Sequence, residues 1–388
     1  MARRALGDGQ LSVLDREISQ LDWAAINPIT RGLFRISGTA RMSSGDIAPW
    51  LVVLKVVGDA DLIDTGYCHE PADWNYWKRE ALAFRSGLLA GWPGPLSPVC
   101  AYAVDDAADD EVWIWLQACG DVRAKSPADP EKLASTAHDL RAFAAQWAAA
   151  PPSRDRYPWL AHRWVGGWVT TFRALGVDHA LRHEGCWTTT LLGDVLPRST
   201  HRRVKDLLNA ADGLQQRLAS LPITLAHHDT QWSNAFPAEQ AGRESGTVMI
   251  DWSFVGLAPA GTDLGLHVSG NLTSRAVDPQ RATDHDRAAT DAYLHGLRGH
   301  GWAGSTEAVL FARAASAALV AGTWLTGEAS WQCPEMIAMV GDEFSTWPES
   351  LAEQQRTDVA TVMEGWAATF DFLLDLGDEA IRLSDHSL

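Results

Sequence analysis

One segment of the sequence constrains the fold and the chemistry of this chain more than any other. Residues 225–236 read LAHHDTQWSNAF and place His227, Asp229 and Asn234 in the spacing H-x-D-x-x-x-x-N. The apolar start and end of the segment predict two strands, and the polar residues between them predict a connecting loop. The segment therefore indicates a polar loop that is held between two strands.

A second segment follows this loop in a way that gives it a chemical meaning. Residues 248–253 read VMIDWS, so that Asp251 ends an apolar run. Phosphoryl transfer from a metal-bound nucleotide needs one carboxylate near the acceptor hydroxyl, and an amide and a second carboxylate that hold Mg²⁺ on the phosphates. The alternative is two strands joined by ordinary turn residues, and the rest of the chain decides between the two interpretations.

The composition limits the number of domains, the partners and the cellular compartment that this chain can have. The chain has 388 residues, 46% of them hydrophobic, and the 49 acidic against 32 basic residues give a net charge of −17. This length predicts two domains or lobes, and the negative charge argues against nucleic acid as a partner. No apolar run approaches the roughly 20 residues of a membrane span, so we expect no membrane association. The five cysteines are scattered and form no C-x-x-C, which favours free thiols in the cytoplasm.

The 19 tryptophans are an unusual feature, and several of them gather between residues 147 and 187. Such residues most often pack in the core and at its rim. The alternative is an aromatic wall for a substrate.

The first 60 residues predict a short helix and a β-hairpin. Residues 11–23 carry Leu14, Ile18 and Leu21 at helical spacing. The strand-like runs at 32–42 and 50–57, which are joined by a turn, predict an antiparallel hairpin. Lys55 lies inside the apolar second strand, where a buried charge needs a partner. The alternative is a lysine on the solvent face of that strand.

A helix with a carboxylate on its apolar face is predicted next. Residues 71–87 begin with Pro71, and Glu80 shares a stripe with Trp77 and Phe84. A carboxylate so placed after a strand lysine indicates a Lys–Glu pair that grips nucleotide phosphates. The alternative is a surface glutamate among Lys78, Arg79 and Arg85.

A second hairpin and a long helical region complete the predicted order. Residues 100–104 and 111–116 form strands around an acidic turn at 105–110, and the lobe boundary is placed after them, giving lobes at 1–118 and 119–388. Helices are expected at 133–150, 204–218, 308–320 and 359–370.

The G-x-G-x-x-G match at 299–304 follows a helix rather than a strand, so we interpret it as a helix–helix turn with Ser305 as an N-cap.

In this order, Lys55, Glu80, Asp229, Asn234 and Asp251 resemble the aminoglycoside phosphotransferase and choline kinase-like family, in a branch common in actinobacterial genomes. The resemblance covers residues 25–270. It implies an α+β, bilobal protein-kinase-like fold, with an N-terminal antiparallel sheet lobe that carries one main helix and a larger, mainly helical C-terminal lobe. It also implies a phosphotransferase that uses ATP and Mg²⁺ to phosphorylate a hydroxyl of a small molecule, such as an aminoglycoside, an amino alcohol or a sugar.

The resemblance also implies roles for single residues. Asp229 would be the catalytic base, and Asn234 and Asp251 would bind Mg²⁺. Lys55, paired with Glu80, would contact the nucleotide phosphates. The backbone from Leu116 to Ala118 would hold the adenine, and His227 and Asp263 would support the site structurally.

Three departures from the family pattern leave alternatives open. His228 stands where the family usually has glycine, as a filler of the loop or as a contact to substrate. Arg31, in a short nucleotide-covering loop with one glycine, would contact phosphate or lie in an ordinary surface turn. Gln231 stands where protein kinases usually have lysine, which favours a small-molecule acceptor.

Two other functions remain open from the sequence. One is a Ser/Thr kinase that modifies a peptide in natural-product maturation, and the other is a non-catalytic pseudokinase that binds a nucleotide or a partner protein. The oligomeric state does not follow from the sequence.

Overall fold

The chain folds into two compact units, each built from three segments. The structure, a computed structural model, describes residues 1–21, 27–60, 68–90, 94–120, 130–148, 150–188, 190–242, 244–299, 302, 304–340 and 345–385. Unit 1 comprises Met1–Ala124, Ser153–His162 and Ser233–Val255, and unit 2 comprises Lys125–Pro152, Arg163–Trp232 and Gly256–Leu388. The boundary expected at 118/119 lies close to the end of the first segment, but two later segments also belong to unit 1.

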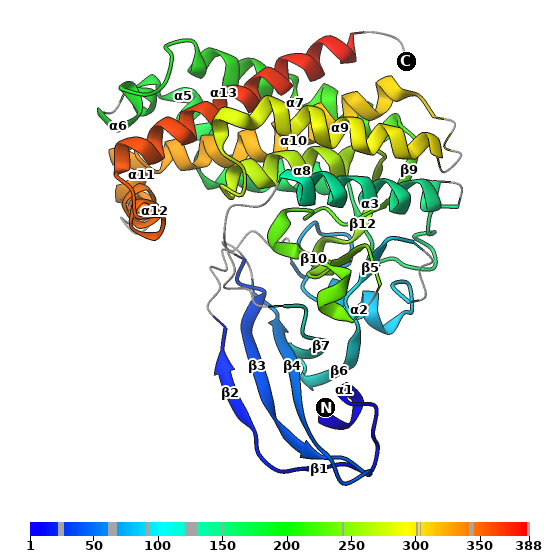
Figure 1. The fold of residues 1–388 in the computed structure, drawn as a ribbon. Coiled ribbons are helices and arrows are strands. Elements are labelled where there is room, and N and C mark those ends of the chain that lie inside the picture. The colour runs from blue at the N-terminus through cyan, green and yellow to red at the C-terminus, as the bar shows by residue number, and fades with distance from the viewer. Residues whose placement is uncertain are drawn as a thin grey trace. The chain divides into compact units, whose positions relative to one another are not determined.

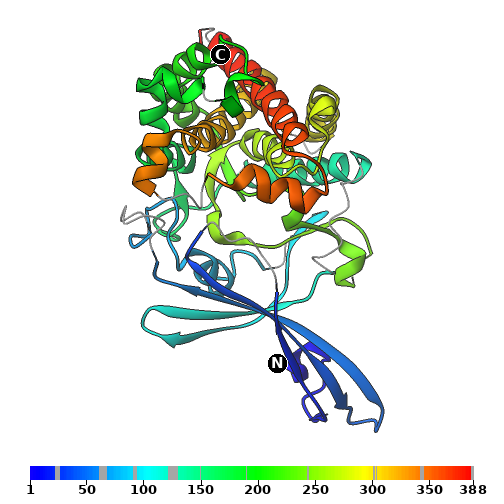
Figure 2. The same cartoon turned by 90° about the vertical axis from the view of Figure 1, so that its left-hand side faces the viewer.

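Unit 1 is built around an antiparallel sheet with the strand order β1-β3-β4-β7-β6, in which β2 also pairs with β3. The pair of β3 and β4 is long and twisted, as Figure 2 shows in blue. A second, smaller sheet has the order β10-β11-β5. The strands are β1 (Ser12–Val13), β2 (Glu17–Gln20), β3 (Thr30–Arg41), β4 (Ile47–Gly58), β5 (Leu96–Pro98), β6 (Ala101–Ala108), β7 (Glu111–Gln117), β8 (Ala161–His162), β10 (Ala235–Pro237) and β11 (Thr247–Met249), and the helices are α1 (Ala2–Ala5) and α2 (Arg79–Arg85).

The alternation of β4 places Lys55 on one face of the sheet and the core residues Leu54 and Val56 on the other. Lys55 pairs in register with Leu33 of β3 and Ile114 of β7. Residues that lie opposite each other on antiparallel strands share a face, so the lysine stem lies between two apolar neighbours. Lys55 is only 4% exposed, which excludes the solvent-face alternative.

The prediction of a helix at residues 11–23 is wrong for the residues that the structure describes. Residues 12–13 and 17–20 form β1 and β2, which pair with β3, and residues 22 and 23 lie outside the described residues. Leu14 and Ile18 are 47% and 59% exposed, so their helical spacing marks no buried face. The long edge of β3 offers backbone partners all along its length, and this pairing outweighs the local periodicity.

The helix predicted at residues 71–87 is shorter than expected, because α2 begins at Arg79. The Asp73 carboxylate accepts a hydrogen bond from the backbone of Glu70, which stabilises a turn rather than a helix. The Arg79 guanidinium binds the carbonyl groups of Asp73 and Trp74 and so holds them outside a helix. The acidic turn is also shorter than predicted, since β6 continues to Ala108.

Unit 2 is mainly helical, with α10 (Thr306–Ser330) at its centre and α8 and α13 packed against it (Figure 1). By length and composition α10 would cross a membrane, but 83% of its most apolar window is buried among the other helices. A small antiparallel pair, β9 (Ile223–Ala226) and β12 (Gly256–Pro259), belongs to the same unit. The other helices are α3 (Pro130–Ala148), α4 (Trp164–Phe172), α5 (Asp178–Arg182), α6 (Thr190–Gly193), α7 (Thr200–Ser220), α8 (Thr262–Thr273), α9 (Ala282–Gly299), α11 (Pro334–Val340), α12 (Trp347–Gln355) and α13 (Val359–Ser384).

The fold class predicted from the sequence is confirmed: the chain is α+β, with one antiparallel-sheet unit and one mainly helical unit. The glycine-rich match at 299–304 lies at the junction of α9 and α10, and residues 300, 301 and 303 of it lie outside the described residues. The Ser305 hydroxyl accepts a hydrogen bond from the Ala308 backbone, as expected for an N-cap.

Gly261 provides a test of the packing between α8 and α10. Its φ is +103°, and a Cβ built there would lie 2.4 Å from the carbonyl oxygen of Val309. We expect Gly261→Ala to lower the free energy of unfolding by about 2–4 kcal/mol, from backbone strain and overpacking together. Chemical denaturation measures this change.

Gly213 is the matched control, because it lies in the interior of α7 with no heavy atom within 4 Å of a Cβ built there. Gly213→Ala should raise the free energy of unfolding by about 0.5–1 kcal/mol. Equal effects of the two substitutions would contradict the close approach of α8 to α10.

Candidate functional site

Three charged residues of unit 1 meet in one buried ion triad, although they are far apart in the sequence. The Lys55 nitrogen lies 2.7 Å from Glu80 Oε2 and 2.7 Å from Asp251 Oδ1. The side chains of Lys55 and Glu80 are 5% and 1% exposed, and that of Asp251 is 34% exposed. The structure thus places the lysine and the helix glutamate together as the sequence predicted, and it adds Asp251 to them.

The triad keeps Lys55 positively charged. Burial alone would lower the pKa of its ammonium, but the nearby carboxylates of Asp251 and Glu80 outweigh burial and raise the pKa. The lysine therefore stays a cation at any physiological pH. Burial raises the pKa of Glu80, although the nearby Lys55 ammonium opposes this shift.

Glu80 and its neighbour Arg79 also fix the backbone around the triad. Glu80 Oε1 accepts a hydrogen bond from the backbone N–H of Trp252 (3.1 Å), the residue after Asp251. Arg79 is fully buried and donates to the backbone carbonyls of Trp159 and Ser253. Burial lowers the pKa of Arg79 to about 9. In the sequence, Arg79 entered only the alternative in which Glu80 lies on the surface, and no local pattern indicated that it ties backbone segments together.

The two residues predicted to bind a metal lie at the end of the small sheet. Ala235 of β10 pairs with Met249 of β11, and the Ile250 N–H donates to the carbonyl of Asn234 (2.9 Å). Asn234 therefore lies opposite Ile250, one residue before Asp251. The Asp251 backbone is left-handed (φ +57°, ψ +70°), and its Oδ1 accepts a hydrogen bond from Ser253 Oγ (2.7 Å). An amide oxygen and a carboxylate at adjacent register positions are ligands that suit Mg²⁺.

In unit 2 the loop that carries Asp229 is held by one stripe of α8. The residues of this docking stripe, Asp263, His267 and Asn271, are spaced four apart, so they lie on one face of the helix. Asp263 accepts the backbone N–H groups of His227 and His228, each at 2.9 Å. Burial raises the pKa of Asp263 to about 6, although the two amide donors oppose this shift.

The rest of the docking stripe holds the loop further along. His267 Nδ1 lies 2.9 Å from the Thr230 carbonyl oxygen, and Asn271 Oδ1 accepts the Trp232 N–H (2.8 Å). His267 and Asn271 are both fully buried. The sequence identified Asp263 as a support, but it did not identify the two stripe residues that follow it at helical spacing.

The loop itself turns around Asp229. The backbone N–H of Asp229 donates to His227 Nδ1 (3.2 Å), and Asp229 Oδ1 accepts a hydrogen bond from Gln231 (3.0 Å). His228 has a φ of +66°, in the left-handed region that favours glycine. Its ring is 2% exposed and stacks on Trp164 at 5.2 Å, so it fills space beside the loop. This ring contact offsets a backbone cost of roughly 1–2 kcal/mol.

The predicted site residues are divided between the two units. Lys55, Glu80, Asn234 and Asp251 belong to unit 1, and Asp229 belongs to unit 2, because the chain passes from one unit to the other between residues 232 and 233. Distances between these residues are defined only within each unit. The two groups are connected along the chain, where Asn234 follows Asp229 by five residues.

The remaining predicted nucleotide contacts all lie in unit 1. The Arg31 side chain binds Asp110 Oδ2 (2.9 Å) and lies 3.5 Å from Glu111 Oε2, at the turn between β6 and β7. A contact between Arg31 and phosphate stays a prediction. Leu116 is buried in β7, and Ala118 follows the strand, half-buried. Their role in holding adenine also stays a prediction.

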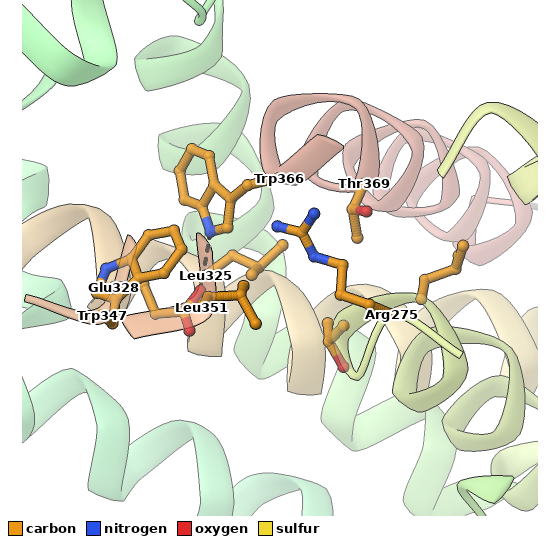
Figure 3. Close-up of a pocket in the computed structure, with 9 residues that line it drawn as sticks. Arg275, Leu325, Glu328, Trp347, Leu351, Trp366 and Thr369 are labelled. Carbon is orange, nitrogen blue, oxygen red and sulfur yellow. Dashed lines mark hydrogen bonds between the residues drawn. The ribbon is translucent and has the colours of Figure 1, made fainter. Parts of the chain in front are cut away.

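A small cavity of unit 2 lies beside the end of the docking stripe. Leu272 and Thr273, which directly follow Asn271, line it, and its volume is ≈ 30 Å³. Figure 3 shows Trp366 above Glu328, with a hydrogen bond of 2.8 Å from the indole N–H to Oε2. Burial raises the pKa of Glu328 to about 7. The sequence did not identify Glu328, since it lies in the apolar helix α10 without a neighbouring motif.

Comparison with known proteins gave matches to solved structures only. No family model matches the sequence, and no curated protein matches it. The chain is similar to an aminoglycoside phosphotransferase from Alicyclobacillus acidocaldarius, with 13% identity and a TM-score of 0.49 over 100% of this chain and 97% of the other. It is also similar to a spectinomycin phosphotransferase in complex with ADP and spectinomycin (13%, 0.47, 92% and 93%) and to an ethanolamine kinase from Plasmodium vivax (11%, 0.46, 96% and 82%).

These matched structures bear the names of the family that the sequence resembles. With identities of 11–13% and TM-scores below 0.5, none of them transfers the role of a residue to this chain. The role of each residue therefore rests on its own contacts in this chain.

The docking stripe can be tested at Asn271. Asn271→Leu keeps a similar volume but removes the acceptor of the Trp232 N–H, so the free energy of unfolding should fall by about 1–3 kcal/mol. Hydrogen exchange at the Trp232 amide should become faster. Chemical denaturation and exchange measured by mass spectrometry provide the two results.

Thr273→Val on the same helix is the control. The Thr273 hydroxyl donates to the Ser269 carbonyl of its own helix, so its loss should change the free energy of unfolding by less than about 0.5 kcal/mol. Unchanged exchange at Trp232 in the Asn271 variant would show that the stripe does not hold the loop.

Glu328 predicts a dependence of stability on pH. Its pKa is about 7 when folded and near the ordinary glutamate value of 4.5 when unfolded, so between these values the folded state binds more protons. The contribution of Glu328 to stability therefore falls as pH rises from 4.5 through 7, by roughly 3 kcal/mol in total. Glu328→Gln should remove this loss and be more stable than the parent at pH 8, as measured by urea denaturation.

Glu364→Gln is the control for Glu328, because Glu364 is exposed on α13. Its stability difference from the parent should stay the same across this pH range. A constant difference for Glu328→Gln as well would mean that the Glu328 carboxyl has an ordinary pKa in the folded protein.

Proposed function

We propose that this protein is an ATP- and Mg²⁺-dependent phosphotransferase that transfers the γ-phosphate to a hydroxyl of a small molecule. The observation that carries the proposal is the ion triad, in which Lys55 lies 2.7 Å from both Glu80 and Asp251. A strand lysine paired with a helix glutamate, beside a carboxylate for the metal, is the arrangement that positions nucleotide phosphates for transfer.

Each member of the triad has a separate task in this proposal. The Lys55 ammonium binds the phosphates, and Glu80 holds it in place by an ion pair that excludes water. Because Glu80 also binds the Trp252 backbone, it fixes the orientation of Asp251. The adenine would lie against the backbone from Leu116 to Ala118, beyond the buried end of β7.

Asn234 and Asp251 would hold the magnesium ion. Their adjacent register positions and their oxygen donors fit a hard divalent cation. When bound, the ion neutralises charge on the phosphates. The protein's own contribution is to keep both side chains in place through the β10–β11 pairing and the left-handed turn at Asp251.

Asp229 would orient the acceptor hydroxyl and accept its proton. Its backbone is fixed by His227, which is in turn tied to Asp263, so the loop is positioned before substrate binds. Gln231 donates to the Asp229 carboxylate and occupies the place where protein kinases usually have lysine. A neutral amide there favours a small acceptor over a peptide.

We place this activity in the cytoplasm, with lobes close to residues 1–118 and 119–388. None of the five cysteines, all of which lie in the part of the chain that the structure describes, forms a disulfide, which agrees with a reducing compartment.

The first test is nucleotide turnover. Purified protein with ATP and Mg²⁺ should release ADP when the right acceptor is supplied from a panel of aminoglycosides, amino alcohols, sugars and short peptides. Asp229→Asn should lower this rate by at least about 10²-fold, because the general base is lost while the shape is kept. Coupled ADP detection measures both rates.

Asp212→Asn is the matched control, since Asp212 is exposed on α7, and it should keep the full rate. Turnover with a peptide but no small molecule would replace the proposed acceptor by a Ser/Thr side chain. Nucleotide binding without turnover for any acceptor would indicate a pseudokinase. Absence of nucleotide binding would contradict the roles of Lys55 and Asp251.

A further inference from the structure

Two cysteines and a histidine of unit 2 meet at a place that the proposed kinase chemistry does not use. His179 lies in α5, Cys186 follows in a 3₁₀ turn, and Cys333 lies between α10 and α11. One ligand atom from each of the three residues lies within 4.8 Å of the other two. Figure 1 shows α5 and α11 at the same end of unit 2.

The backbone holds these residues in a defined arrangement. The Cys186 N–H donates to His183, and the Cys333 N–H donates to the Ser330 carbonyl at the end of α10, each at 3.0 Å. Gly176, just before α5, lies so close to this junction that a Cβ there would be 2.7 Å from Ser330 Oγ. The two parts of the cluster are therefore packed directly on each other.

The distances fit a tetrahedral zinc ion. Zinc bonds of 2.3 Å to sulfur and about 2.05 Å to nitrogen require sulfur and nitrogen ligands about 3.6 Å apart and two sulfurs about 3.8 Å apart. Cys333 Sγ lies 3.8 Å from His179 Nε2, and all other ligand distances are within 4.8 Å. Shifts of a few tenths of an ångström up to about 1 Å would close the site around the ion.

The residue types select the metal. Thiolate and imidazole ligands together favour zinc over magnesium or calcium, which prefer oxygen. Two thiolates and a neutral imidazole also balance the two charges of the ion. This balance matters because Cys186 and Cys333 are 0% and 2% exposed, where an uncompensated charge is costly.

Access to the site comes from the histidine side. His179 is half-buried, and its ring stacks on that of the exposed His183 at 4.2 Å. A water molecule from this side would complete four-coordination. Both buried thiols would then lie behind the ion, away from solvent.

We propose that His179, Cys186 and Cys333 form a zinc site that joins α5 and its following turn to the junction of α10 and α11. The three residues are 154 residues apart at their extremes, so the bound ion closes a long loop. Metal ligation across such a loop adds binding energy to the stability of the folded state. The site shares no residue with the proposed phosphotransfer site, so it is independent of that activity.

The test uses the full-length, reduced and metal-free protein. Titration with Zn²⁺ against a chromophoric chelator should show one tight site per chain. Co²⁺ should give the visible bands of a tetrahedral ion and a near-ultraviolet band from thiolate-to-metal charge transfer. The visible bands and the charge-transfer band of the bound Co²⁺ should disappear when excess Zn²⁺ is added and replaces it.

Substitutions then identify the ligands. Cys186→Ser, Cys333→Ser and His179→Gln should each weaken Zn²⁺ binding by roughly a hundredfold, because each removes one of three protein ligands. Cys100→Ser is the matched control, since Cys100 is exposed in unit 1, and it should bind like the parent. Zn²⁺ should raise the melting temperature of the parent and of this control, but not of the three ligand variants.

The Co²⁺ spectrum of the unchanged protein keeps the proposal testable even if a buried cysteine variant does not fold. An octahedral spectrum without a thiolate band would overturn the proposal. Full Zn²⁺ affinity in any of the three ligand variants would also overturn the proposal. A third contradicting result would be a Cys186–Cys333 disulfide in protein purified without reductant, if the protein then bound no Zn²⁺ after the disulfide had been reduced.

Discussion

The ion triad of Lys55, Glu80 and Asp251 is the interaction on which unit 1 depends. It joins the sheet, helix α2 and the end of β11, and its buried members are stable only together. Removing one partner from a buried ion pair typically costs about 3–5 kcal/mol, because the remaining charge stays desolvated. Apolar residues of the same volume would stabilise the folded protein as well as this cluster does. The presence of the triad is therefore better explained by a chemical role than by packing.

Unit 2 solves a different problem with hydrogen bonds from side chains to the backbone of a loop. The loop that carries Asp229 has backbone N–H and carbonyl groups that form no hydrogen bonds of the kind found within a strand pair or a helix. The docking stripe of α8 supplies their partners from a single rigid helix, so the loop needs no substrate to order it. The proposed zinc site of His179, Cys186 and Cys333 would fix a different part of the same unit, at the far end of the helix α10 on which α8 packs.

Much of the fold and of the candidate site could be predicted from the sequence, for identifiable reasons. The strand around Lys55, the acidic hairpin and the long helices have strong local patterns, and the spacing of Asp229, Asn234 and Asp251 is fixed by the chain. The strands at residues 12–20 could not be predicted, because the long edge of β3 decides their pairing. The burial of Arg79 and Glu328 and the meeting of Cys186 with Cys333 depend on contacts between distant segments, which leave no trace in local sequence.

The discontinuous construction of unit 1 has a consequence for how the protein is made. Lys55 and Asp251 are separated by 196 residues, so a ribosome that adds about 5–20 residues per second needs roughly 10–40 seconds between them. During this interval the N-terminal sheet has its lysine but lacks one of its two counter-charges and the β11 strand of its companion sheet. During synthesis, the first third of the chain therefore cannot complete the structure of unit 1 until the later segments have been made. Chaperones would have their longest access to it in this period.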